Sequence, residues 1–134
     1  MKALTLTEPW ATLMRLGEKN IETRSWKTNF RGLIAIHAAK TMPAYAKEFL
    51  RNNEVIAAFF RQETQPWFRP GVILCVRELI DCIPTTQVKN LSFKERTFGD
   101  YSPGRFAWLF APEIKIITPA IQVKGSLGLW NWER

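Results

Sequence analysis

The sequence has few of the residues from which disulfide frameworks and metal centres are built. Its 134 residues include two cysteines and one histidine. Cys75 and Cys82 are seven positions apart on one apparent strand, which would place them about 23 Å apart, too far for a disulfide bond. With His37 distant from both, the sequence shows no metal-ligand spacing, and we expect neither a metal nor another cofactor.

Long hydrophobic runs are also missing. No apolar stretch approaches the roughly 20 residues needed to cross a bilayer. The basic start, Met1-Lys2, is followed by an amphipathic segment rather than by the apolar core of a signal peptide. We therefore expect a cytoplasmic protein without membrane association. The length and an apolar fraction of 46% favour a single folded domain over residues 1–134.

Acidic residues are in short supply, with 12 Asp and Glu against 19 Lys and Arg, for a net charge of +7. Most of this excess lies within residues 1–40. A basic domain rich in aromatic residues suits nucleic acids or nucleotides, because phosphates pair with Lys and Arg and bases stack on aromatic rings. Many basic proteins bind neither, so this indication needs a second observation.

The densest group of charged residues lies in segment 17–31, with the sequence GEKNIETRSWKTNFR. If residues 21–26 are extended, Glu22, Arg24 and Trp26 share one face of the strand. A carboxylate and a guanidinium on one face must pair with each other or line a wet cleft. We interpret this face as a cleft for a polar or anionic ligand. The alternative is a solvated hairpin edge, whose ion pairs contribute about 0 to 1 kcal/mol each.

The pattern Gly17-x-Lys19-x-x-Glu22-x-Arg24 resembles the signature of the ASCH domain family. The similarity continues in LTLTEPWATL at residues 4–13, RGLIAIHAAK at 31–40 and GLWNW at 128–132. It therefore covers most of the chain. The resemblance implies a β-barrel similar to PUA RNA-binding domains, with RNA or a nucleotide bound at the cleft.

Hydrophobic periodicity predicts strands at residues 2–7, 21–26, 32–39, 72–83, 105–111 and 114–123. Helices are expected from Pro9 to Gly17, from about residue 41 to 52, and around residues 55–60, whereas residues 85–96 are ambiguous and have room for a short helix. Residues 62–70 and 97–104 are predicted loops, the first anchored by its aromatic side chains. The fold class is α+β, mainly β: a closed or nearly closed PUA-like barrel of about six strands with flanking helices.

As a binding module, the protein would meet phosphates or polar base edges with basic side chains, namely Lys19, Arg24, Lys27, Arg31 and Lys40. Glu22 would orient Arg24 or accept a hydrogen bond from an amino group, and Trp26 or Tyr101 would stack on a base. Single strands, loops or isolated nucleosides are the expected ligands, since their bases are exposed for stacking. His37 is either a structural histidine, which its apolar neighbours favour, or a residue bordering the site.

A hydrolase is the second hypothesis. Some small relatives of ASCH proteins deacetylate N4-acetylcytidine, and the resemblance implies a Lys, a Thr nucleophile three residues later and a downstream Glu as base. Lys19 matches the first, but Glu22 occupies the nucleophile position, Thr23 is one place off, and Glu78 is the downstream candidate. Glu22 would instead activate a water while Lys19 stabilises the oxyanion. Such a cluster would also suit a ribonuclease.

A protein-interaction adaptor is the third hypothesis, because ASCH domains also occur in transcription coactivators. A large exposed apolar patch would favour it.

Overall fold

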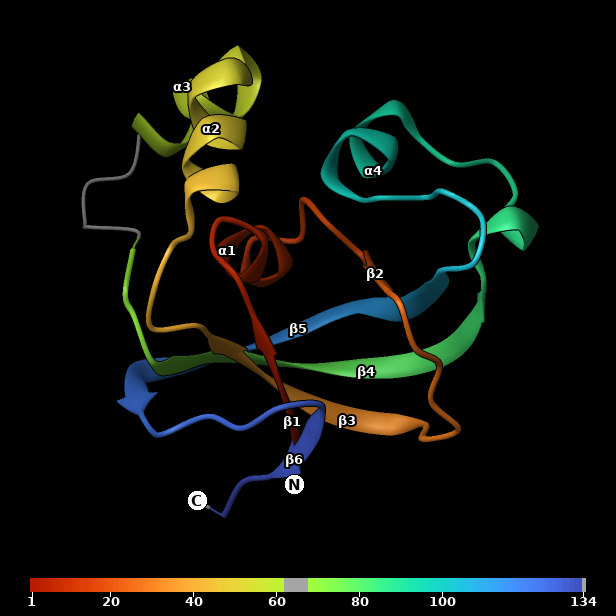
Figure 1. The fold of residues 1–134 in the computed structure, drawn as a ribbon. Coiled ribbons are helices and arrows are strands. Elements are labelled where there is room, and N and C mark those ends of the chain that lie inside the picture. Colours follow the sequence, from red (N-terminus) through yellow and green to blue (C-terminus); the bar gives the residue numbers. More distant parts are fainter. Residues whose placement is uncertain (62–67, 134) are drawn as a thin grey trace.

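A mixed sheet of six strands forms the centre of the molecule (Figure 1). The computed structural model describes residues 1–61 and 68–133. The strand order is β2-β5-β4-β3-β1-β6, and only the β1–β3 pair is parallel among the described residues. The strands are β1 (Lys2–Leu6), β2 (Ile21–Arg24), β3 (Gly32–Ala38), β4 (Val72–Pro84), β5 (Phe106–Gln122) and β6 (Leu129–Asn131).

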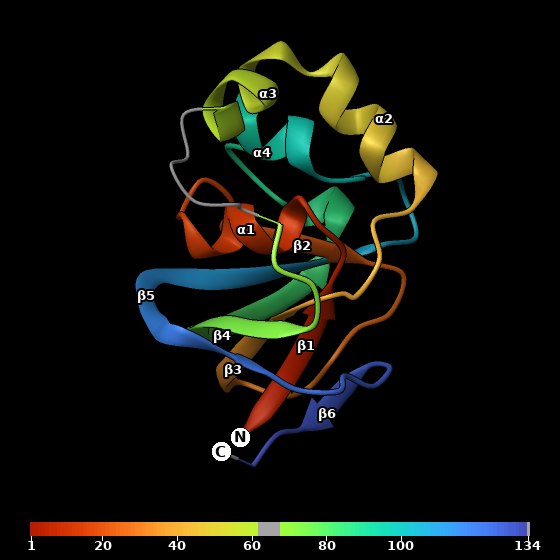
Figure 2. The same ribbon diagram turned by 90° about the vertical axis from the view of Figure 1, so that its left-hand side faces the viewer.

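The sheet curves into a half-barrel with helices gathered on one side of it (Figure 2). Four α-helices lie within the described ranges: α1 (Trp10–Arg15), α2 (Ala44–Asn52), α3 (Glu54–Arg61) and α4 (Phe93–Phe98). The predicted α+β, mainly β class and the count of about six strands are confirmed. The barrel is half open, however, because β2 and β6 are the two edges of the sheet.

Strand β3 shows why the centre of the sheet is buried on both faces. Ile34, Ile36 and Ala38 belong to the cluster under α1, whereas Ala35 belongs to a second cluster on the opposite face. Segment 123–128 crosses this second face, where the Val123 carbonyl lies 2.9 Å from His37 Nε2. Alternating small and branched apolar residues therefore give one strand two dry faces.

Strand β5 differs from the prediction of two separate strands at residues 105–111 and 114–123. It runs unbroken through Pro112 and Pro119. Strand β2 pairs only with residues 106–109 of β5, so the later part of β5 is a sheet edge, and there a proline need not donate a hydrogen bond. Register shifts in the β4–β5 pairing accommodate the two prolines within β5. The six predicted strands therefore correspond to five observed strands, β1 to β5. The sixth strand of the sheet, β6, was not among the predictions.

Local signals explain the helix boundaries. Gly17 ends the α1 segment with φ +76°, a conformation that favours glycine. Helix α4 begins at an N-cap, Ser92, whose Oγ accepts the Glu95 N–H at 3.1 Å. The ambiguous segment 85–96 holds a 3-10 turn at Thr85–Gln87 and the start of α4, which continues to Phe98 and so takes the first two residues of the predicted loop 97–104. None of the helices in the described ranges is long and apolar enough to cross a membrane. The predicted loop at 62–70 lies mostly outside the described residues.

Candidate functional site

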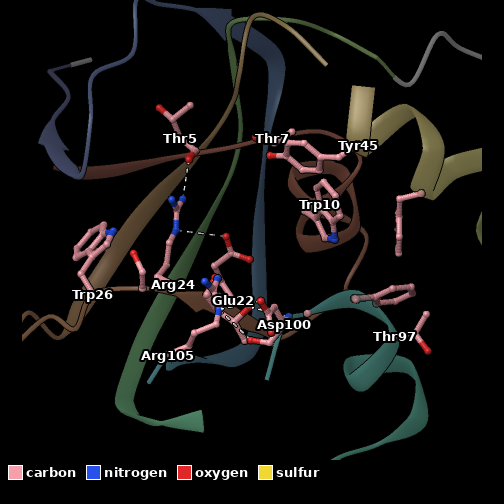
Figure 3. Close-up of a pocket in the computed structure, with 15 residues that line it drawn as sticks. Thr5, Thr7, Trp10, Glu22, Arg24, Trp26, Tyr45, Thr97, Asp100 and Arg105 are labelled. Atoms are coloured by element: carbon pink, nitrogen blue, oxygen red, sulfur yellow. Dashed lines mark hydrogen bonds and ion pairs between the residues drawn. The ribbon is translucent and has the colours of Figure 1, made fainter. Parts of the chain in front are cut away.

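A pocket of about 470 Å³ lies between the sheet and helices α1, α2 and α4 (Figure 3). This volume is in the range typical of small-molecule sites. Five segments of the chain contribute to its wall: the end of β1 with α1, the β2 strand and the residues after it, α2, α4, and the loop from α4 to β5. The lining residues are Thr5, Thr7, Trp10, Glu22, Thr23, Arg24, Ser25, Trp26, Tyr45, Phe49, Thr97, Phe98, Gly99, Asp100 and Arg105.

One wall of the pocket is built on the carboxylate of Glu22. Its Oε1 lies 3.3 Å from Lys19 Nζ and its Oε2 lies 3.4 Å from Arg24 Nε. Arg24 Nη2 in turn donates to the Thr5 carbonyl at 2.8 Å, which links edge strand β2 to β1 (Figure 3). The two neighbouring cations fix a negatively charged acceptor at the pocket wall, where the Glu22 side chain is 13% exposed.

Lys19 lies behind this wall rather than in the pocket. Its side chain is fully buried, and Nζ contacts the carbonyl oxygens of Ile21 and Phe98 in addition to Glu22. A buried ammonium is tolerated when several acceptors surround it. The sequence predicted that Lys19 contacts a phosphate or base edge directly. In the structure Glu22 lies between the Lys19 ammonium and the pocket, so Lys19 can act on a ligand only through Glu22.

The loop that carries Lys19 is held from below by a buried arginine. Arg77 on β4 donates to the carbonyl oxygens of Lys19 at 2.7 Å, Met14 at 3.2 Å and Ala111 at 2.8 Å. It also donates to Asn20 Oδ1 at 2.5 Å. Burial lowers the pKa of this guanidinium. Sequence reasoning missed this role, because it placed Arg77 at the emerging end of its strand.

Aromatic rings form the wall that faces Glu22. Trp10 of α1 lies 5.0 Å from Phe49 and 6.1 Å from Tyr45 between ring centroids, both at 31°. Figure 3 shows Trp10 and Tyr45 across the pocket from Glu22 and Arg24. Sequence reasoning did not select this wall. The signal was available, because Tyr45 and Phe49 are four residues apart on one helix face.

The aromatic residues that the sequence did suggest lie elsewhere. Trp26 borders the pocket, but its ring packs edge-on against Trp108 at 4.8 Å, and its carbonyl accepts the Trp108 indole N–H at 3.2 Å. Tyr101 is half-buried outside the lining, and its hydroxyl has no partner among the described residues. Burial, with the nearby carboxylates of Glu95 and Glu22, raises its pKa. Neither ring presents a free face comparable to that of Tyr45.

A second ion pair closes the lower side of the pocket. Arg105 Nε lies 3.6 Å from Asp100 Oδ2, and Nη2 donates to the Thr23 carbonyl at 3.1 Å. The Thr23 hydroxyl accepts the Asp100 N–H at 3.1 Å. Hydrogen bonds from Ser102 lower the pKa of Asp100. Each arginine in the lining is therefore matched by a carboxylate, so the pocket carries little net charge.

The remaining candidates do not line the pocket. Lys27, Arg31 and Lys40 are exposed, and Arg31 pairs with Asp81 at 3.4 Å. Their expected phosphate contacts stay predictions.

His37 is buried, and both of its ring nitrogens have a partner: Nδ1 lies 2.9 Å from Thr5 Oγ1, and Nε2 lies 2.9 Å from the Val123 carbonyl. These two contacts are typical of a structural histidine, so they favour a structural role for His37. A Cβ at Gly125 would lie 2.7 Å from its ring, so a glycine is needed there.

The three residues suggested for a hydrolase, Lys19, Glu22 and Glu78, do not lie together at one site. Lys19 is buried behind Glu22, and Glu78 is exposed on β4 in register with Leu33, away from the pocket lining. Glu22 alone of the three faces the pocket. Thr23 lies at the pocket, although its hydroxyl already accepts a backbone N–H.

Comparison with known proteins places the chain in a family. A family model described as the ASCH domain matches residues 4–120. The chain is 30% identical over 136 residues to the human protein "Activating signal cointegrator 1", a match that covers 96% of this chain and 22% of that relative. The chain thus spans about a fifth of the length of this relative. The family match includes most of β1, the pocket and nearly all of β5, and we conclude that the chain belongs to the ASCH domain family.

Proposed function

We propose that this ASCH domain binds single-stranded RNA and takes one base into the pocket. The observation that carries the proposal is the pair of facing walls, with the ring of Tyr45 on one side and the Glu22–Arg24 pair on the other. An aromatic wall offers stacking to any base, and a polar wall offers hydrogen bonds to its edge. A duplex keeps its bases paired and stacked, so a single strand is the better ligand.

The distribution of charge supports a base, rather than a phosphate group, inside the pocket. Arg24 and Arg105 are both paired with carboxylates at the lining. The chain nevertheless carries a net charge of +7, and exposed residues such as Lys27 and Lys40 belong to that excess. We therefore place the phosphates of the strand outside the pocket, on the exposed basic side chains.

The test compares RNA binding by two exposed-aromatic variants. Tyr45 is 62% exposed at the pocket, whereas Phe93 is 84% exposed on α4 and is not part of the lining. Base stacking on an aromatic ring is worth about 1 to 3 kcal/mol. Tyr45→Ala should therefore weaken binding of a labelled single-stranded RNA by roughly 5- to 150-fold in fluorescence anisotropy. Phe93→Ala should leave it unchanged.

A duplex of the same sequence should bind more weakly than the single strand to the wild type. Equal affinity for both forms, together with an unaffected Tyr45→Ala variant, would refute a base-binding pocket.

A further inference from the structure

The polar wall has a defined order of donors and acceptors. Glu22 presents two carboxylate oxygens, and Arg24 lies beside it. Arg24 Nη2 donates to the Thr5 carbonyl, and Nε is buried 3.4 Å from Glu22 Oε2, an ion-pair contact without a hydrogen bond. Nη1 has no protein acceptor in the described part of the chain. The wall therefore offers two neighbouring acceptors and one adjacent donor group.

The four bases differ in how well they complement this order. Guanine carries one acceptor, O6, beside two adjacent donors, N1–H and the N2 amino group. Uracil has one N–H between two carbonyl oxygens, and a carboxylate repels those oxygens. Adenine and cytosine place a ring-nitrogen acceptor beside their amino group, so only one of the two Glu22 oxygens finds a donor. Guanine alone satisfies both acceptors and the donor.

From this complementarity we infer that the pocket selects guanine, with Glu22 accepting from N1–H and N2–H and Arg24 donating to O6. This inference rests on the proposed function and adds the identity of the base. Lys19 acts through Glu22 in this arrangement. Its buried ammonium contacts Oε1 from behind and holds the carboxylate in position. Hydrogen bonds to a charged acceptor are the stronger ones, which makes their loss measurable.

The sharpest test changes the ligand and leaves the protein intact. Oligouridine strands carrying one central guanosine, inosine, 1-methylguanosine, adenosine or cytidine are titrated into the wild-type protein. Inosine lacks the N2 amino group, and the methyl group blocks N1–H. A correctly paired base edge gives discrimination of roughly 5- to 150-fold. We expect guanosine to bind most tightly, inosine about tenfold more weakly, and 1-methylguanosine no better than the oligouridine background.

A protein variant provides the matching measurement. Glu22→Gln replaces one acceptor by a donor and should abolish the preference for guanosine over adenosine. Glu78→Gln changes an exposed carboxylate on β4 that lies outside the lining, and should keep the preference. Because Glu22→Gln leaves Lys19 without its charged partner, its melting temperature is measured alongside. If that variant unfolds, the inosine and 1-methylguanosine results decide.

The outcomes separate the inference from the proposed function. Equal binding of all strands, or a preference for cytidine or adenosine, would overturn the selection of guanine while leaving RNA binding intact. Failure of every strand to bind would overturn both.

Discussion

At the scale of single residues, Glu8 is a fully buried carboxyl group beside the pocket. It accepts hydrogen bonds from the backbone N–H of Thr12 at 2.8 Å and from the Thr12 hydroxyl at 2.6 Å. No salt bridge to Glu8 occurs in the described part of the chain. Burial raises its pKa to about 7, although the two hydrogen bonds and the more distant charge of Arg69 oppose this. Glu8 therefore carries a proton that neutral pH begins to remove.

We predict that this proton makes stability fall as pH rises from about 5 to 8. The folded pKa of about 7 lies above the ordinary value of 4.5, so the folded state binds more protons than the unfolded state in this window. The free energy of unfolding should decrease by up to about 3 kcal/mol. Glu8→Gln should flatten this dependence in urea titrations at several pH values.

Glu48→Gln is the control, because Glu48 is exposed on α2 and its removal should leave the slope in place. A Glu8→Gln protein with the full wild-type slope would contradict the assignment.

Residue-level prediction from sequence worked best for short, contiguous patterns. The spacing of Glu22 and Arg24 on a strand placed both on one face, and both line the pocket. The burial of Lys19 was not predictable, because its acceptors are main-chain carbonyls and a glutamate that meet only after folding. The aromatic wall was missed because its rings come from two helices more than 30 residues apart.

At the scale of elements, the loop between α1 and β2 depends on contacts from distant parts of the chain. Arg77 on β4 binds it from the sheet, and Glu95 on α4 accepts the Asn20 N–H at 2.6 Å. Gly17 supplies the left-handed turn that starts the loop. The position of Glu22 therefore follows from a strand and a helix that sequence reasoning had not connected with it.

We predict that Arg77→Met lowers the free energy of unfolding by at least about 3 kcal/mol. The substitution removes the donors for three buried carbonyl groups, and each unsatisfied buried group costs about 1 to 3 kcal/mol. Lys115→Met on the neighbouring strand β5 is the control. Lys115 is exposed, so the change should stay within about 0.5 kcal/mol. Urea unfolding compares the two, and equal losses would argue against a supporting role for Arg77.

Strands β1, β3 and β4 followed from periodicity, because each has regular apolar positions over five or more residues. Strand β5 did not, since Pro112 and Pro119 are ordinary signs of a strand end, and the pairing that tolerates them is not visible locally. Strand β6 has three residues and too little pattern to detect. Its pairing with β1 is a tertiary property.

At the scale of the whole molecule, charge is divided between a balanced pocket and a basic exterior. We therefore predict that affinity for an RNA strand falls steeply with salt, while affinity for a neutral nucleoside changes little. Lys27→Gln should weaken strand binding for all sequences alike. It should also reduce the slope of log affinity against log salt by about 1.

Calorimetric or anisotropy titrations between about 50 and 300 mM salt would measure the salt dependence of affinity for the strand and for the nucleoside. A slope unchanged in Lys27→Gln would remove that residue from the phosphate-binding surface. An equally steep slope for the nucleoside would mean that the pocket itself attracts anions.

The two ends of the described chain lie next to each other, on the side of the molecule opposite the helices (Figure 1). The Met1 ammonium donates to the Trp132 carbonyl at 2.9 Å, and the Trp132 N–H donates to the Met1 carbonyl at 2.8 Å. An anchor attached at either end would leave the binding cavity pointing away from the support. Protein immobilised in this way should thus bind ligand as tightly as the free protein does. A short bridge between the ends offers a route to a circular permutant.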